Sequence, residues 1–142
     1  MYGKIKFCDF ARATHNGSRF DAIGAGLTNI NVPNLPAPIF FSILIEAGFD
    51  PTDIGKEFLF EIITADPEGK PISIRPISGI ITVDDIQSLK SYAAFSVQFI
   101  IKKEGVFTYT FKINDVKLDE NALNVSIKPN IAIEKKPRRK RK

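Results

Sequence analysis

The segment Phe107–Ile113 reads Phe-Thr-Tyr-Thr-Phe-Lys-Ile, so apolar and polar side chains alternate along it without interruption. A period of two is typical of a β-strand with one buried face and one solvated face. Similar alternation recurs in Phe58–Ile62, Phe95–Ile101 and Leu123–Ile127. Ile39–Ile45 is apolar on both faces and is expected in the middle of a sheet. The chain is therefore expected to be built from β-strands.

Turn-forming residues separate these runs at short intervals, among them Asn16-Gly17, Asp66-Pro67-Glu68-Gly69 and Lys103-Glu104-Gly105. Many short strands with frequent turns indicate an all-β protein, an antiparallel β-sandwich of about eight strands, immunoglobulin-like or jelly-roll. We expect at most one short helix, Asp84–Lys90, because its first turn is acidic and its end is basic.

The pair Asn16-Gly17 is the clearest local signal, because both central positions of a type I′ turn need positive φ and these residues adopt it easily. A two-residue loop at this point sets the cross-strand register. The pairs it predicts are His15 with Ser18, Arg12 with Asp21, Phe10 with Ile23, and Cys8 with Ala25.

Length and composition indicate one domain. The chain has 142 residues, of which 44% are hydrophobic, and a single cysteine that cannot form an intramolecular disulfide. No secretory signal and no long apolar stretch is recognised, so we expect a cytoplasmic protein without a membrane span. We predict a β-sandwich domain over residues 1–130 and a basic, disordered tail over 131–142.

The tail carries the positive charge. Residues 1–134 hold 13 basic and 16 acidic side chains and have a net charge of −3, although the whole chain is +4. A run of cations predicts a salt-dependent contact with nucleic-acid phosphates or an anionic surface, without sequence specificity. The expected contact residues are Lys135, Lys136, Arg138, Arg139, Lys140, Arg141 and Lys142.

Residues for catalysis are scarce, since His15 is the only histidine and Cys8 the only thiol. In the hairpin register they share one strand, roughly 23 Å apart and on opposite faces, so they form no Cys-His dyad. Glu57 and Glu61 share a strand face about 13 Å apart, which is wide for a glycosidase pair. We expect no enzyme, and keep a hydrolase or carbohydrate-processing domain as the weakest alternative.

Metal and cofactor sites are not expected either. Zinc needs several Cys, His or carboxylate ligands, and the chain has one of each of the first two. Carboxylates that could meet around calcium lack the spacing of a calcium loop; they are Asp50 with Asp53, Asp84 with Asp85, and Asp115 with Asp119 and Glu120. Gly24-Ala25-Gly26 lacks the third glycine and the helix of a nucleotide-binding loop.

Four segments carry a resemblance: Phe7-Cys8-Asp9-Phe10-Ala11, Asn16-Gly17, Ala22-Ile23-Gly24-Ala25-Gly26 and Leu35-Pro36-Ala37-Pro38. In this order they resemble a family of uncharacterised, mainly bacterial β-sandwich proteins of unknown function. The similarity covers roughly residues 5–45. It implies a fold and a bacterial or phage setting, and it implies no activity. The basic tail departs from the family pattern.

These observations favour a non-enzymatic binding or assembly module with a basic C-terminal tether. A protein partner or a second copy is the expected ligand, because strands at sheet edges present unpaired backbone groups. Lys4–Phe10 and Asn121–Lys128 are the strands expected to pair across a dimer axis. The main alternative is a nucleic-acid-associated protein that contacts phosphates through residues 135–142.

Overall fold

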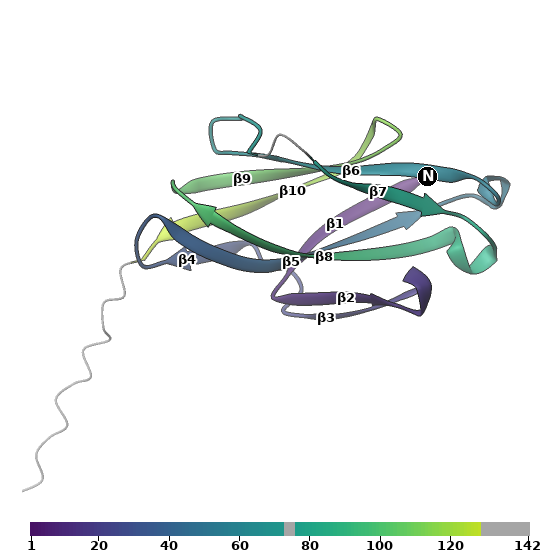
Figure 1. Cartoon of the computed structure of the whole chain (residues 1–142), viewed down its shortest axis with the longest axis horizontal. Helices are drawn as coiled ribbons and strands as arrows, with labels where there is room; N and C mark the ends of the chain where they lie inside the picture. The colour runs from purple at the N-terminus through teal and green to yellow at the C-terminus, as the bar shows by residue number, and fades with distance from the viewer. Residues whose placement is uncertain (73–75, 129–142) are drawn as a thin grey trace, which may run out of the picture.

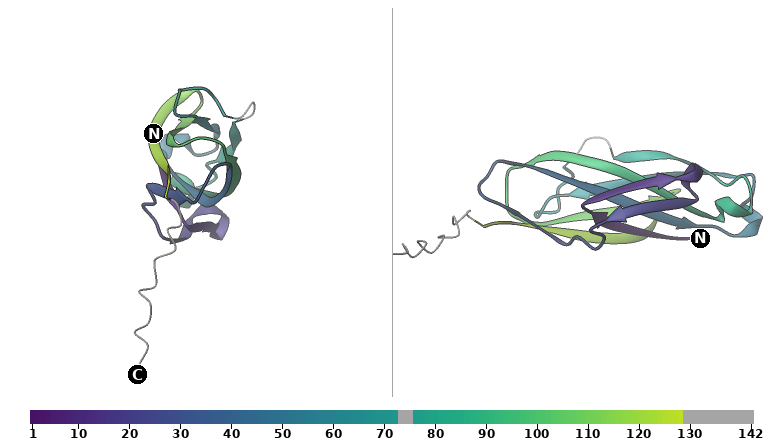
Figure 2. Two further views of the ribbon diagram at one scale, coloured as in Figure 1. Left: turned by 90° about the vertical axis from the view of Figure 1, so that its left-hand side faces the viewer. Right: turned by 90° about the horizontal axis from the view of Figure 1, so that it is seen from below.

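The computed structural model describes residues 1–72 and 76–128, which form two β-sheets packed face to face and a separate hairpin (Figures 1 and 2). The three-stranded sheet has the order β1 (Tyr2–Cys8), β5 (Ala37–Gly48), β8 (Lys90–Ile101). The five-stranded sheet has the order β4 (Asn29–Val32), β10 (Val116–Ile127), β9 (Gly105–Ile113), β6 (Glu57–Ala65), β7 (Ile77–Thr82). The hairpin consists of β2 (Phe10–Thr14) and β3 (Arg19–Ile23).

All paired strands are antiparallel except β4 and β10, which are parallel. The all-β fold class is therefore confirmed. The described residues contain ten strands rather than about eight. One of them, β4, has only four residues and gives no periodic signal.

Helical structure in the described residues is limited to three single turns, η1 (His15–Gly17), η2 (Pro51–Asp53) and η3 (Ile86–Leu89). The expected short helix is the η3 turn. The Asp85 carboxylate begins it by accepting a hydrogen bond from the Ser88 amide, at 3.1 Å. This turn connects the end of β7 to β8, so it carries the chain from one sheet to the other.

The hairpin follows the predicted register, with Phe10 opposite Ile23 and Arg12 opposite Asp21. Asn16 and Gly17 have φ of 55° and 84°, and the Ser18 amide donates to the His15 carbonyl at 3.1 Å. The predicted pair of Cys8 with Ala25 is wrong. Cys8 ends β1 and lies opposite Ser42 of β5, because the chain leaves the sheet at Asp9 and begins a new strand.

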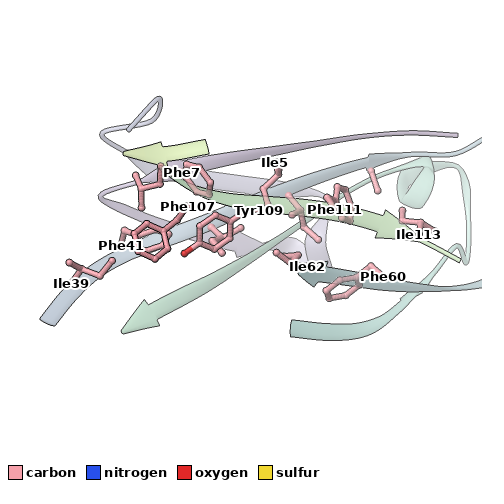
Figure 3. Close-up of a cluster of buried hydrophobic side chains, with 14 of the residues drawn as sticks. Ile5, Phe7, Ile39, Phe41, Phe60, Ile62, Phe107, Tyr109, Phe111 and Ile113 are labelled. Carbon is pink, nitrogen blue, oxygen red and sulfur yellow. The ribbon is translucent and has the colours of Figure 1, made fainter. Parts of the chain in front are cut away.

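The core lies between the sheets and combines aromatic rings with isoleucine, valine and leucine side chains (Figure 3). The rings of Phe7 and Tyr109 meet edge to face with centroids 4.9 Å apart, and Phe41 lies 6.0 Å from Tyr109. Phe7 belongs to β1, Phe41 to β5 and Tyr109 to β9, so this cluster joins both sheets. The alternation in Phe107–Ile113 places every second side chain of β9 in the core, where these side chains are buried.

The hairpin covers the outer face of the three-stranded sheet. Ala11 of β2 packs there with Cys8 and Leu44, and Ala22 of β3 joins them. This second cluster explains why the segment from Ile39 to Ile45 is apolar on both faces. Its place in the middle of a sheet is confirmed, since β5 pairs with β1 on one side and β8 on the other.

Candidate interaction site

The outer edge of β1 is closed by side chains of β10. The Ile5 amide donates to the Asp119 carboxylate at 2.8 Å, and the Ile5 carbonyl accepts from the Asn121 side-chain amide at 3.0 Å. A register shift between Lys117 and Asp119 marks a bulge in β10, and bulges re-aim side chains in this way. The predicted dimer strand Lys4–Phe10 therefore has its central backbone groups already occupied.

The second predicted dimer strand, Asn121–Lys128, is also paired. β10 lies between β9 and β4, and β4 covers it from Asn124 to Ile127. The Lys128 amide continues this pairing by donating to the Val32 carbonyl at 2.9 Å. The prediction failed because strand order depends on β4, a four-residue segment.

The two outermost strands of the larger sheet offer short edges. β4 has four residues, and β7 has six with Gly79 in the middle. In β6, Leu59 exchanges hydrogen bonds with Asn114 on the β9 side. The amide and carbonyl of successive residues point to opposite sides of a strand. Because those of Leu59 point to β9, those of Phe60 point to its partner Gly79 in β7. The amide of Ser78 consequently points away from β6.

The outer edge of β8 is different, and its free groups follow from the register. The Ile5 amide bonds to Asp119 and therefore points away from β5. Ile5 and its partner Ile45 are thus a pair without hydrogen bonds between them, and the amide and carbonyl of Ile45 point toward β8. Ile45 lies opposite Ala93, and Ala93 therefore bonds to β5. The residues that alternate with Ala93 direct their amides and carbonyls away from β5; they are Tyr92, Ala94, Ser96, Gln98 and Ile100.

This edge is long, and the hairpin tip approaches it at Tyr92. β8 has twelve residues and pairs with β5 without a register shift. From Ser91 to Ile101 it contains no charged residue, no proline and no glycine. Among the described residues, β5 is the only strand that is hydrogen-bonded to β8. Edge strands are usually protected by charges, proline, bulges or shortness, and a long apolar edge without them is a site for pairing with another chain.

Two clefts open beside β8 on the side where the two sheets meet. One of about 320 Å³ lies among the hairpin tip, η3 and β8, with His15, Asp84 and Asp85 among its lining residues. The other, of about 420 Å³, lies near the C-terminal end of β8 and includes Phe99 and Phe107. An added strand would therefore find hollows for its side chains next to free backbone groups.

Ion pairs flank the apolar stretch of β8. The Lys103 ammonium lies 2.8 Å from the Asp66 carboxylate, and this contact raises the pKa of Lys103 and holds the pKa of Asp66 below its usual value. At the other end Lys90 lies 3.8 Å from Glu46, whose charge raises the pKa of Lys90. Lys102 is exposed and makes no ion pair within residues 1–72 and 76–128.

The cleft beside η3 does not assemble a nucleophile and a base. His15 is exposed at the hairpin tip. The Ser18 hydroxyl donates to the His15 carbonyl at 2.8 Å, the Ser88 hydroxyl bonds to Asp85 at 3.1 Å, and the Ser91 hydroxyl donates to a carbonyl at 2.8 Å. These hydroxyls stabilise the local turns, and no hydrogen bond joins a serine to the His15 ring among the described residues.

Cys8 and His15 lie in different environments. Cys8 is fully buried beneath the hairpin, and this burial raises the pKa of its thiol. The two residues do not share a strand, because β1 and β2 are separate. The prediction that Cys8 and His15 share one strand is therefore wrong.

The carboxylates singled out in the sequence have local contacts. Within the described ranges, no three His, Cys, Asp or Glu side chains gather in an arrangement that could hold a metal ion. Asp119 binds the Ile5 amide, and Asp53 binds the Asp50 amide at 3.0 Å. Glu57 and Glu61 share a face of β6 that alternates with the buried Phe58 and Phe60.

The predicted phosphate-contacting residues, from Lys135 to Lys142, lie outside the described residues, as does the proposed tail 131–142. In the part of the chain that the structure describes, no helix has the length and apolar character needed to cross a membrane. The free edge of β8 was missed from the sequence. Its signal was the uncharged run from Ser91 to Ile101, which alone indicates only a strand.

Fold and edges define a class: a small two-layer β-protein in which β8 has one long edge without a partner strand among the described residues. The chain belongs to a family of unknown function, DUF6941, whose model matches residues 5–126. This confirms the resemblance to an uncharacterised family and extends it over most of the chain. No curated protein matches the chain.

Solved structures with some similarity are crystal structures of a β-glucosidase from Listeria innocua. The enzyme alone gives a TM-score of 0.44 at 7% identity, covering 88% of this chain and 16% of the enzyme chain. Its complex with isofagomine gives 0.45 at 8% identity with the same coverage, and its complex with glucose gives 0.41 at 7%. The chain thus spans about one sixth of the enzyme's length.

Proposed function

We propose that this protein is a non-enzymatic binding or assembly module that binds an extended protein segment by strand addition at β8. The observation that carries this proposal is the outer edge of β8, which no described strand pairs with and which is uncharged from Ser91 to Ile101. In strand addition, main-chain hydrogen bonds supply affinity, and pockets for alternate side chains supply specificity. The two clefts beside β8 suit that second requirement.

The strand order supports an immunoglobulin-like connectivity in preference to a jelly-roll. Without the hairpin and β4, the strands β1, β5, β6, β7, β8, β9 and β10 follow the order of strands A, B, C, C′, E, F and G of that fold. Strand D, which would extend the sheet beyond strand E, has no counterpart among the described residues. The place next to β8 is therefore one that related folds fill with a strand.

A selection with short random peptides displayed on phage tests this function. Wild-type protein should enrich peptides with alternating apolar residues. Ser96→Pro should abolish their binding, because proline removes an amide that points away from β5 and leaves the β5 pairing intact. Ser78→Pro is the matched control on the edge of β7. Enrichment that is equal with Ser96→Pro would overturn strand addition at β8.

The second candidate is a contact between residues 135–142 and nucleic-acid phosphates. It rests on seven basic side chains within that segment. Labelled single- and double-stranded nucleic acid should bind the full chain at low salt, lose affinity steeply at moderate salt, and not bind the fragment 1–134. Equal binding by that fragment would refute the tail as the contact.

A further inference from the structure

We propose that the strand that pairs with β8 is β8 of a second copy of this chain, giving a symmetric dimer; this inference rests on the strand-addition function proposed above. A twofold axis perpendicular to the sheet pairs the two β8 strands in antiparallel orientation. Both copies then contribute the same surface to the interface, so this surface has to be complementary to itself. Such a dimer would join the two three-stranded sheets into one continuous sheet.

The hairpin tip restricts the register of this pairing. A Cβ atom built on Gly17 would lie 3.0 Å from the Tyr92 carbonyl oxygen. The tip therefore occupies the edge of β8 at Tyr92, and the outward-facing groups beyond it run from Ala94 to Ile100. Val97 is the midpoint of that stretch. An axis through Val97 uses the whole of this stretch, and the hairpin tip of each copy then limits the ladder at both of its ends.

The side chains complement one another in this register. Ala94 lies opposite Ile100 of the second copy, and Phe95 lies opposite Phe99 of the second copy. Ile100 is 60% exposed in the single chain, and the dimer places it beside Ala94, which packs with Tyr92 beneath the hairpin. A small residue thus meets a large one on the outer face, and two aromatic rings meet on the inner face.

Charges also complement one another. No charged side chains oppose each other within the ladder, because β8 has none from Ser91 to Ile101. Beyond the ladder, the same register brings Lys102 of one copy next to the hairpin tip at Tyr92 of the other. The cleft at that point is lined by Asp84 and Asp85. The twofold axis repeats this attraction at both ends of the interface.

Sedimentation velocity of the full chain over a wide concentration range tests the dimer. A ladder of this length buries an area at the low end of specific interfaces, below roughly 1,200 Å², so the dimer should form and dissociate reversibly. Wild type and Ser78→Pro should dimerise alike, and Ser96→Pro should raise the dissociation constant at least about tenfold. A wild type that stays monomeric at every concentration overturns the dimer, as does one unaffected by Ser96→Pro.

Disulfide trapping tests the register. In the Val97-centred pairing the two Val97 residues form a non-hydrogen-bonded pair with Cα atoms about 4.5 Å apart, within the range of about 4.4–6.8 Å for disulfides. Val97→Cys should cross-link under mild oxidation. Ser96→Cys, which faces Gln98 of the second copy, should not. Wild type is the background control because Cys8 is buried. Preferential cross-linking of Ser96→Cys would overturn the register.

Failure of the dimer and failure of the proposed function give different results. A monomeric wild type that still selects peptides, and loses them with Ser96→Pro, overturns the dimer and retains strand addition. A monomeric wild type that selects no such peptides overturns both.

Discussion

Replacing Asp119 tests how the β1 edge is kept closed. The Asp119 carboxylate accepts the Ile5 amide at 2.8 Å and also accepts the Glu120 amide at 2.8 Å. A hydrogen bond to a charged group contributes about 1.5–3 kcal/mol, so Asp119→Ala should lower the free energy of unfolding by about that amount. Asp119→Asn keeps an oxygen acceptor and should lose less than half as much.

Equilibrium unfolding in urea, followed by far-ultraviolet circular dichroism, measures these differences. The Asp119→Ala change should also free the Ile5 amide for another chain, so a second edge becomes available beside that of β8. Two free edges on opposite sides of one sheet permit open-ended association. Sedimentation should then show species larger than the wild type forms. An Asp119→Ala protein with wild-type stability and unchanged association would refute the edge-closing role of Asp119.

The other predictions concern the core and the hairpin. Burial raises the pKa of Tyr109 to about 12, whereas an unfolded tyrosine has a pKa of about 10. The contribution of Tyr109 to the free energy of unfolding is therefore full below about pH 10 and falls by about 2–3 kcal/mol as the pH rises to about 12. Unfolding experiments across this pH range should show this loss in the wild type and not in Tyr109→Phe. Gly17→Ala should destabilise more than Gly55→Ala in thermal melts, because both have positive φ and only Gly17 approaches Tyr92. Cys8 should react with a thiol reagent only when the protein unfolds, since it is fully buried; rapid labelling of the native state would contradict its burial.

The sequence predicted strands and turns well because their signals are local. The alternation in Phe107–Ile113 predicts a strand with one buried face, and the structure buries that face. The Asn16-Gly17 turn fixes its own register, since two residues supply the needed positive φ. The pairing of Phe10 with Ile23 follows directly from it.

Edges were harder to predict because they depend on contacts distant in sequence. The segment Lys4–Phe10 looks exposed from its alternating lysines, yet Asp119 and Asn121 reach its backbone from more than a hundred positions away. In contrast, the uncharged run from Ser91 to Ile101 has the composition of a central strand. A local sequence pattern therefore predicts that a segment is a strand, but it does not predict which strands pair with it.

The contrast among the edges is itself an argument for the role of β8. A protein that only had to stay monomeric would gain from a charge or a proline on its longest edge. β1 carries Lys4 and Lys6 and is closed by β10, β4 has four residues, and β7 has Gly79. β8 alone among the described edge strands has length, an unbroken register and no charge across its middle. The flanking clefts and the hairpin tip at Tyr92 restrict which strands can pair with β8 and in which register. Such restrictions are expected of a specific binding edge and not of a site of non-specific aggregation.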